Sequence, residues 1–255
     1  MNANVSTIAP LVAFDLDDTL APSKGLLAEP MAHALAALLE RTSVAVISGG
    51  QFSQFRSQLV EPLENIGAAQ LDRLHLMPAC GTQYYRYNGD GWKRVYIEAL
   101  GDEEKGWALT IIETAARELD YWPASPWGAP LEDRESQITF SALGQEAPLK
   151  DKEAWDPTGE KKRRLRERIA PLLPELEVRA GGSTSIDITR RGRDKSYGIT
   201  RLLDATKCDI SDVLFFGDQL QEGGNDHPVL AMGIRCVAVS DWQHTLREVN
   251  KILRD

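Results

Sequence analysis

A short apolar run that ends in carboxylates most constrains what this chain can fold into. Residues 11–14 read Leu-Val-Ala-Phe, and residues 15–19 follow at once as Asp-Leu-Asp-Asp-Thr. An apolar run of this length that stops at polar residues predicts a buried strand, and open α/β sheets build their sites at strand ends. Because alternate residues of a strand point the same way, Asp15 and Asp17 are expected to face one crevice.

Two carboxylates held this close repel each other unless a proton or a cation joins them. Mg²⁺ prefers oxygen ligands, so the pair predicts a magnesium site at the end of the strand. Taken alone, the pair is equally compatible with an acidic turn. A calcium loop of the EF-hand type is excluded, because Leu20 and Leu26 stand where that loop needs glycine and glutamate. The sequence also contains no P-loop and no paired-glycine dinucleotide fingerprint.

Length and composition favour a soluble globular protein. The 255 residues are 42% hydrophobic and 26% charged, which suits one large domain or two moderate ones. The net charge of −9 argues against nucleic-acid binding but permits a small anionic substrate. The three cysteines have no metal-binding spacing and predict a reduced, cytoplasmic setting. No apolar run reaches the length of a membrane span and residues 1–10 lack a signal peptide pattern, so no membrane association is expected.

Strand-like and helix-like segments alternate at both ends of the chain. Further strands are expected at residues 44–47, 74–78, 213–216 and 235–239, and helices at residues 31–40, 51–59, 195–203 and 241–253. Alternation of this kind predicts a parallel sheet with helices on both faces. The expected fold class is therefore α/β, with a Rossmann-like doubly wound core.

The middle of the chain has a different character. Five of the six tryptophans fall within residues 92–155, and Asn88-Gly89-Asp90-Gly91 between two strand-like runs predicts a hairpin. Hairpins in place of strand–helix alternation indicate an inserted α+β domain. We expect a catalytic core over residues 1–82 and 190–255 and a substrate-selecting cap over residues 83–189. Gly81 and Gly192 are expected to act as hinges between them.

Polar side chains follow three of the expected core strands. Asp15 follows the first, Ser48 and Gly49 follow the second, and Asp218 follows a later one. The carboxyl ends of parallel strands share one edge, and a helix that begins near Lys195 can bring a fixed cation to it. Carboxylates, a hydroxyl and an ammonium suit phosphoryl transfer, in which catalysis is mostly positioning and charge neutralisation.

Four motifs in this order resemble those of the haloacid dehalogenase-like phosphotransferase superfamily. They are residues 15–19 (Asp-Leu-Asp-Asp-Thr), 48–50 (Ser-Gly-Gly), 194–195 (Asp-Lys), and 217–218 (Gly-Asp) with 223–226 (Gly-Gly-Asn-Asp). An insertion between the second and third motifs is similar to subfamily IIB, the sugar-phosphate branch. Within that branch, residues 215–227 and 181–187 are most similar to the eukaryotic-type phosphomannomutases.

The chemistry and this resemblance together imply a role for each motif. Asp15 would be the nucleophile that forms an aspartyl-phosphate, and Asp17 the general acid and base. Ser48 and Lys195 would bind the transferring phosphoryl group. Mg²⁺ would be held by Asp15, by the backbone carbonyl of Asp17 and by Asp218, with Asp226 binding it directly or through water. The implied substrate-binding residues are Lys24, Gly49, Arg134, Gln145, Lys152, Ser185 and Asp187.

The resemblance weakens where the mutases hold the distal phosphate of their substrate. Arg134 fits one arginine position, Lys24 and Lys152 stand at two others, and Gln145 stands where an arginine is expected. Lysine lacks the bidentate fork of arginine, and glutamine removes the charge. A mutase must hold a bisphosphate by either end. We therefore predict a Mg²⁺-dependent phosphatase that acts on a small phosphorylated metabolite, a sugar phosphate.

Two alternatives stay open at this point. The first is a phosphomannomutase or phosphoglucomutase that interconverts sugar 1- and 6-phosphates. The second is a non-catalytic binding protein of the same fold, against which the intact motif set argues. Because the related mutases pair through their caps, the resemblance also admits a homodimer formed through the cap.

Overall fold

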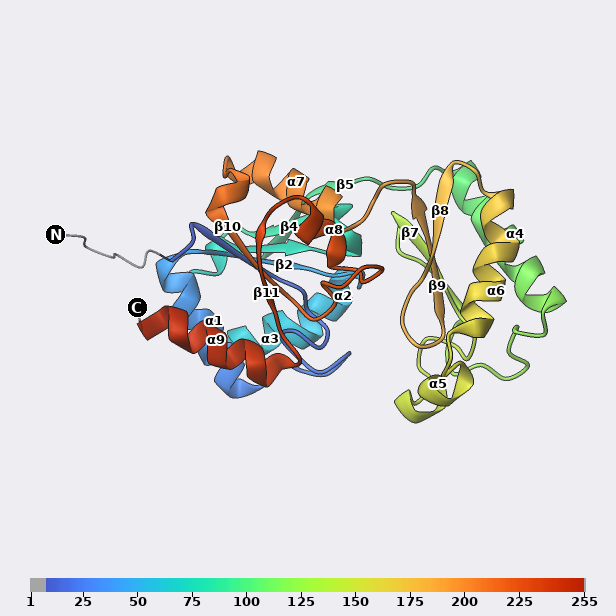
Figure 1. Ribbon diagram of the computed structural model, residues 1–255, viewed down its shortest axis with the longest axis horizontal. Coiled ribbons are helices and arrows are strands. Elements are labelled where there is room, and N and C mark those ends of the chain that lie inside the picture. Colours follow the sequence, from blue (N-terminus) through green and yellow to red (C-terminus); the bar gives the residue numbers. More distant parts are fainter. Residues whose placement is uncertain (1–7, 255) are drawn as a thin grey trace. The chain divides into compact units, whose positions relative to one another are not determined.

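The chain divides into two compact units. The computed structural model describes residues 8–254. The core unit comprises Met1–Tyr96 and Arg193–Asp255, and the inserted unit comprises Ile97–Gly192 (Figure 1). No helix among residues 8–254 is long and apolar enough to cross a membrane.

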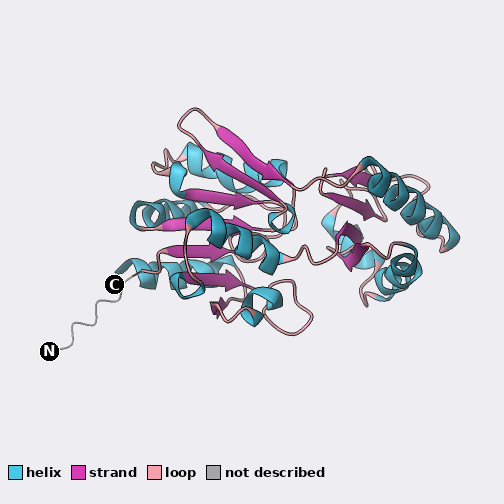
Figure 2. Ribbon diagram, turned by 90° about the horizontal axis from the view of Figure 1, so that it is seen from above, coloured by secondary structure: helices cyan, strands magenta, loops and turns pink. Residues whose placement is uncertain are grey.

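The core unit is built on one seven-stranded sheet (Figure 2). Its strands, in spatial order, are β11 (Arg235–Ala238), β10 (Val213–Gly217), β1 (Leu11–Phe14), β2 (Ser43–Ile47), β3 (Leu74–Met77), β4 (Gln83–Tyr87) and β5 (Trp92–Ile97). The five strands from β11 to β3 are parallel, and β4 is antiparallel to β3. The sequence therefore predicted the α/β, Rossmann-like core correctly.

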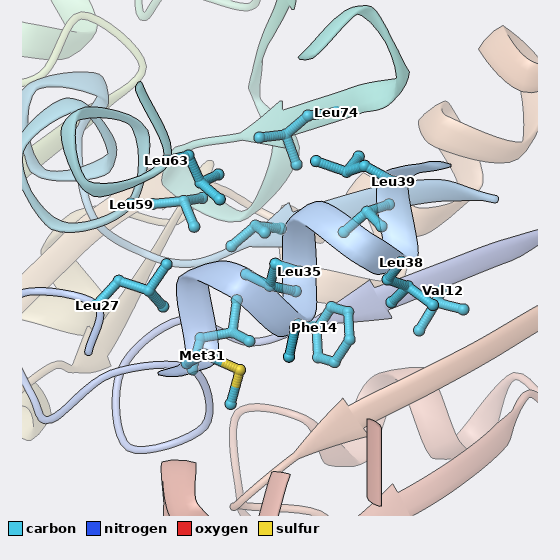
Figure 3. Close-up of a cluster of buried hydrophobic side chains, with 14 of the residues drawn as sticks. Val12, Phe14, Leu27, Met31, Leu35, Leu38, Leu39, Leu59, Leu63 and Leu74 are labelled. Carbon is cyan, nitrogen blue, oxygen red and sulfur yellow. The ribbon is translucent and has the colours of Figure 1, made fainter. Parts of the chain in front are cut away.

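Helices cover both faces of this sheet. Because alternate residues of β1 point to opposite sides, this strand contributes to the buried cluster on each face. Val12 and Phe14 belong to one buried cluster, in which Met31 and Leu35 of α1 lie beside Phe14 (Figure 3). Leu11 and Ala13 belong to the cluster on the other face. The helices of the core unit are α1 (Glu29–Arg41), α2 (Phe52–Phe55), α3 (Glu61–Asn65), α7 (Lys195–Thr206), α8 (His227–Ala231) and α9 (Trp242–Arg254).

The hairpin of β4 and β5 extends the core sheet, whereas the sequence placed it in the cap. β4 pairs with β3 through His75–Arg86 and Leu76–Tyr85, so the inserted unit begins at Ile97. The cause lies in the aromatic residues of β4. Tyr84 is buried in the cluster on one face, and Tyr85 stacks on the ring of Phe52 at 3.9 Å on the other. The two side chains thus pack into the core unit on opposite faces of its sheet.

The inserted unit is an α+β fold with a four-stranded antiparallel sheet. Its strands, in spatial order, are β6 (Leu131–Asp133), β7 (Gln137–Ser141), β9 (Ser185–Arg190) and β8 (Leu176–Ala180), and its helices are α4 (Asp102–Glu118), α5 (Leu149–Trp155) and α6 (Glu160–Ile169). Ile138, Phe140 and Ile186 pack in one cluster with side chains of α4 and α6. By strand alternation, Thr139 and Asp187 point from the opposite, polar face.

Burial of His75 makes the stability of the core pH-dependent. His75 is 3% exposed, and its Nδ1 lies 2.8 Å from the Tyr84 hydroxyl. Burial, assisted by the charge of Arg86, lowers the pKa of His75 to about 3. The unfolded chain binds a proton near pH 6.5 and the folded chain does not, so stability is retained above pH 6.5 and falls as the pH drops towards 3.

An asparagine at position 75 places its side-chain carbonyl oxygen, an acceptor, near the position of the His75 Nδ1 atom. Its side chain does not titrate. We expect the unfolding free energy of the wild type, relative to His75→Asn, to fall by about 2 kcal/mol between pH 7.5 and pH 5. Urea denaturation of both proteins at the two pH values measures this difference. A difference that does not change with pH would contradict a buried neutral His75.

Candidate active site

The polar residues that follow β1, β2 and β10 lie on one edge of the core sheet. These strands are parallel neighbours, so Asp15, Ser48 and Asp218 emerge at the same carboxyl edge. The backbone N–H of Asp15 donates to the carbonyl of Phe216 at 2.9 Å, which continues the pairing of β1 with β10 to the first catalytic candidate. The expected juxtaposition of the strand ends is therefore present.

Lys195 lies at the start of α7, between two carboxylates. The side chain of Asp194 caps this helix by accepting from the backbone N–H groups of Ser196 and Tyr197. The Lys195 Nζ lies 2.6 Å from Asp15 Oδ1 and 2.6 Å from Asp226 Oδ1. Burial alone would lower the pKa of this ammonium, but the two carboxylates raise it. The two carboxylates therefore favour the charged form of Lys195.

Asp15, Asp218 and Asp226 form a cluster that could hold a metal ion. Each offers a carboxylate oxygen, and these oxygens lie within 4.8 Å of one another. Burial raises the pKa of Asp15 and of Asp218, and the charge of Asp226 adds to both shifts. Three carboxylates share one ammonium, so the cluster is short of positive charge. A hard divalent cation with oxygen ligands fits this donor set.

Gly217 makes room for Asp226 in this cluster. A Cβ at position 217 would overlap the Asp226 carboxylate, whose Oδ2 also accepts from the backbone N–H of Gln219 at 3.1 Å. Asp226 is fully buried. The glycine of the fourth motif is therefore required by the close approach of the carboxylate to the strand.

The Asp17 carboxylate is held by a different set of groups. Its Oδ1 accepts from the backbone N–H of Lys24 at 2.8 Å and from Gln58 Nε2 at 3.3 Å. Its Oδ2 accepts from Gln54 Nε2 at 3.0 Å. Neither glutamine was predicted from the sequence. The available signal was their spacing of four residues on the helix after the second motif, which places them on one side of that helix.

A left-handed turn after β3 supports the loop of the second motif. Ser48 is buried, and its Oγ accepts from the backbone N–H of Gly50 at 3.2 Å. The backbone N–H groups of Ala79 and Cys80 donate to the carbonyls of Gly50 and Ser48, each at 2.9 Å. Both residues have positive φ angles, 48° and 56°, which cost energy in residues other than glycine. These two hydrogen bonds thus hold the turn at Ala79 and Cys80 and the Ser-Gly-Gly loop against each other.

Gly81 and Gly198 bring α7 against this same turn. A Cβ at Gly198 would lie 2.5 Å from the carbonyl oxygen of Cys80, and a Cβ at Gly81 would overlap the Cα of Gly198. The Tyr96 hydroxyl also donates to the Gly81 carbonyl at 2.8 Å. Gly81 is therefore a buried packing residue, and the expectation of a hinge there is wrong. This contact links the helix that carries Lys195 to the loop that carries Ser48.

Alanine at position 198 should disturb this contact. Its Cβ would meet backbone atoms, which cannot move aside as a flexible side chain can, so we expect Gly198→Ala to lower the unfolding free energy by about 1–3 kcal/mol. Gly106 is the matched control, because it lies within α4 and its added Cβ would meet no atom within 4 Å. Gly106→Ala should stabilise by about 0.5–1 kcal/mol. Urea denaturation of both variants tests whether Gly198→Ala lowers the unfolding free energy and Gly106→Ala raises it.

Ser185 and Asp187 lie on the polar face of the sheet in the inserted unit. Asp187 Oδ1 accepts from the Thr139 hydroxyl at 2.7 Å on the neighbouring strand. Ser185 pairs with Ser141 in the same ladder. The structure therefore places these two predicted substrate-binding residues on one strand, β9, with side chains on one face.

The basic residues predicted to bind substrate make contacts within their own units. Arg134 Nη2 lies 2.6 Å from Glu132 Oε2. Lys152 Nζ donates to the backbone carbonyl of Gln145 at 2.8 Å, which brings these two predicted residues together. The Gln145 Nε2 atom is buried and has no hydrogen-bond partner among residues 8–254. In the core unit, Lys24 contacts Asp17 through its backbone.

Comparisons with known proteins point to one family. The model of eukaryotic phosphomannomutases matches residues 31–255. The phosphomannomutase of Saccharomyces cerevisiae is 27% identical over 225 residues, which cover 86% of this chain and 84% of the relative. That of Schizosaccharomyces pombe is 26% identical over 251 residues, which cover 95% and 93%.

Solved structures with the same fold include two enzymes of low sequence identity. A haloacid dehalogenase-like hydrolase from Bacteroides thetaiotaomicron has a TM-score of 0.64 at 14% identity, covering 95% of this chain and 98% of that one. The N-terminally truncated, IMP-bound IMP-nucleotidase of Plasmodium falciparum has a TM-score of 0.68 at 17% identity, covering 96% and 68%. At such identities, these likenesses show the fold alone.

Proposed function

The chain belongs to the eukaryotic phosphomannomutase family of the haloacid dehalogenase-like superfamily, and from this premise we propose that it is a phosphomannomutase that interconverts hexose 1- and 6-phosphates. The match to this family carries the choice of a mutase, and the buried Lys195 ammonium, 2.6 Å from Asp15 at the strand end that also bears Asp17, supports phosphoryl transfer. A charged lysine beside a carboxylate nucleophile suits transfer of an anionic phosphoryl group. We place the reaction in the cytoplasm, because three scattered cysteines without a metal-binding spacing suit a reducing compartment.

In this proposal Asp15 and Asp17 have separate tasks. A carboxylate oxygen of Asp15 forms a bond to phosphorus while the bond between phosphorus and the sugar oxygen breaks, and Asp17 gives its proton to that oxygen. In the second step a sugar hydroxyl attacks the aspartyl-phosphate, Asp17 takes the hydroxyl proton, and the Asp15 carboxylate is restored. Lys195 neutralises charge on the phosphoryl oxygens throughout.

Mg²⁺ fits the same edge of the sheet. The residues that would hold it are Asp15 and Asp218, the backbone carbonyl of Asp17, and Asp226 directly or through water. When bound, the ion supplies positive charge to the phosphoryl oxygens. Asp226 also keeps Lys195 and the N–H of Gln219 in place, so its contribution to the site is partly positional.

Hydrolysis of a sugar phosphate is the second candidate function. The residues of the inserted unit that were predicted to hold the distal phosphate favour it. Gln145 has no charge with which to hold a distal phosphate. Arg134 is paired with Glu132, and Lys152 is engaged by the Gln145 carbonyl. If the distal phosphate is held weakly, water rather than a sugar hydroxyl accepts the phosphoryl group from Asp15.

One assay separates the two functions. Mannose and glucose 1- and 6-phosphates are incubated with the enzyme and Mg²⁺, with and without a hexose 1,6-bisphosphate, and both isomer conversion and phosphate release are followed by ³¹P NMR. A mutase should convert isomers at least about tenfold faster than it releases phosphate, and only with the bisphosphate present. Release of phosphate at the higher rate would reject the mutase in favour of the phosphatase.

A further inference from the structure

The helix that follows the second motif contains a π-helical turn next to Asp17. Residues Arg56–Val60 form this turn between α2 and α3, although the sequence predicted one regular helix over residues 51–59. π-helical turns are rare and are frequently found at functional sites. The turn carries Gln58, which is 2% exposed and contacts Asp17.

The orientation of the Gln58 amide is fixed by its neighbours. Its Nε2 lies 2.8 Å from the Gly25 carbonyl oxygen and 3.3 Å from Asp17 Oδ1. Both neighbours are acceptors, so the nitrogen must face them. The Oε1 then points away and, within residues 8–254, finds no hydrogen-bond donor. A buried acceptor without a donor destabilises the fold, so stability alone does not explain a glutamine here.

Gln54 holds the other oxygen of the same carboxylate, and Gly50 leaves the space for it. Gln54 Nε2 donates to Asp17 Oδ2 at 3.0 Å. A Cβ at position 50 would overlap the side-chain amide of Gln54. The last glycine of the Ser-Gly-Gly motif therefore makes room for a contact to Asp17.

We propose that Gln54 and Gln58 are positioning residues that hold the Asp17 carboxyl group at the angle needed to exchange a proton with the sugar oxygen. Gln58 also ties the loop between Asp17 and Gly25 to the helix through the Gly25 carbonyl. The inference rests on the proposed function, because that function assigns the acid and base role to Asp17. Neither glutamine touches Asp15, so its attack on phosphorus does not need them.

This separation predicts that the effect of the glutamines depends on the leaving group. A sugar oxygen needs a proton as it leaves, whereas p-nitrophenolate is stable without one. Gln58→Leu has a similar volume and removes both the donor and the unsatisfied acceptor, so the fold should persist. We expect the single-turnover rate of Asp15 phosphorylation to fall about 10- to 100-fold when a hexose 1,6-bisphosphate is the donor. With p-nitrophenyl phosphate it should change by less than about threefold.

Two further variants make the test decisive. Ser57→Ala changes an exposed neighbour in the same π-helical turn, whose hydroxyl donates to the backbone carbonyls of Ser53 and Gln54, and should leave both rates unchanged. Asp17→Asn should show the same dependence on the leaving group as Gln58→Leu, but larger. Suppose that Asp17→Asn shows the dependence on the leaving group. If Gln58→Leu then lowers the rate equally with both substrates, or lowers neither rate, the positioning role is overturned. If Asp17→Asn shows no dependence, the acid and base role fails and the inference fails with it.

Discussion

Asp15→Asn should lose at least about 10⁴-fold in the rate of phosphoryl transfer while the protein keeps its fold. The amide is nearly the same size as the carboxylate and can still accept from Lys195, which also retains Asp226 as a partner. An amide oxygen is a poor nucleophile towards phosphorus, so the covalent intermediate cannot form. Steady-state turnover and thermal unfolding of the same preparation measure both halves of the prediction.

Asp18 provides the matched control for this variant. It is exposed, lies three residues from Asp15 and accepts through Oδ1 from the backbone N–H of Ser23 at 3.1 Å. Its φ angle is 59°, a left-handed conformation that asparagine tolerates well. Asp18→Asn should therefore retain turnover within about threefold. Comparable losses in both variants would mean that the whole acidic loop, rather than Asp15, carries the activity.

Lys195→Met should give the largest loss of stability. The methionine fills a similar volume but leaves Asp15 and Asp226 facing each other in a buried site. Removing one partner of a buried ion pair costs about 3–5 kcal/mol, so the unfolding free energy should fall by that amount without added metal. Turnover should fall as well, because no fixed cation then faces the phosphoryl group.

A second substitution tests the cause of that loss. Asp226→Asn added to Lys195→Met removes one of the two uncompensated carboxylates, so the double variant should regain part of the lost unfolding free energy. Lys207→Met, an exposed lysine beyond the other end of α7, should change stability by less than about 0.5 kcal/mol. A double variant less stable than Lys195→Met would contradict charge imbalance as the cause. Denaturant titrations in chelator measure all three.

The sequence predicted the core of the site because strand ends are easy to recognise. Residues 11–14 and 213–216 are apolar runs that stop at Asp15 and just before Asp218, and the structure places both at one edge of a parallel sheet. Lys195 could be placed from its motif at the start of a predicted helix. Its partnership with Asp226 could not, because these residues are far apart in the chain and only the packing of α7 brings them together.

Other features had a weak signal in the local sequence, such as the four-residue spacing of Gln54 and Gln58, or none. Gln54 and Gln58 are ordinary polar residues, and a π-helical turn has no periodicity that distinguishes it from an α-helix in so short a segment. The boundary of the inserted unit was misplaced because a hairpin pattern does not say which sheet it joins. The phosphatase preference rested on Gln145 and its neighbours, whereas the family match favours the mutase alternative.

Identification of the phosphorylated residue is the direct test of Asp15 as the nucleophile. The enzyme is mixed with a hexose 1,6-bisphosphate and Mg²⁺, quenched in acid within one turnover, digested, and analysed by mass spectrometry. We expect a phosphoryl group on Asp15 in the wild type and none on this peptide in Asp15→Asn. Turnover by the wild type with the phosphoryl group on another residue, or with none on Asp15, would contradict this expectation.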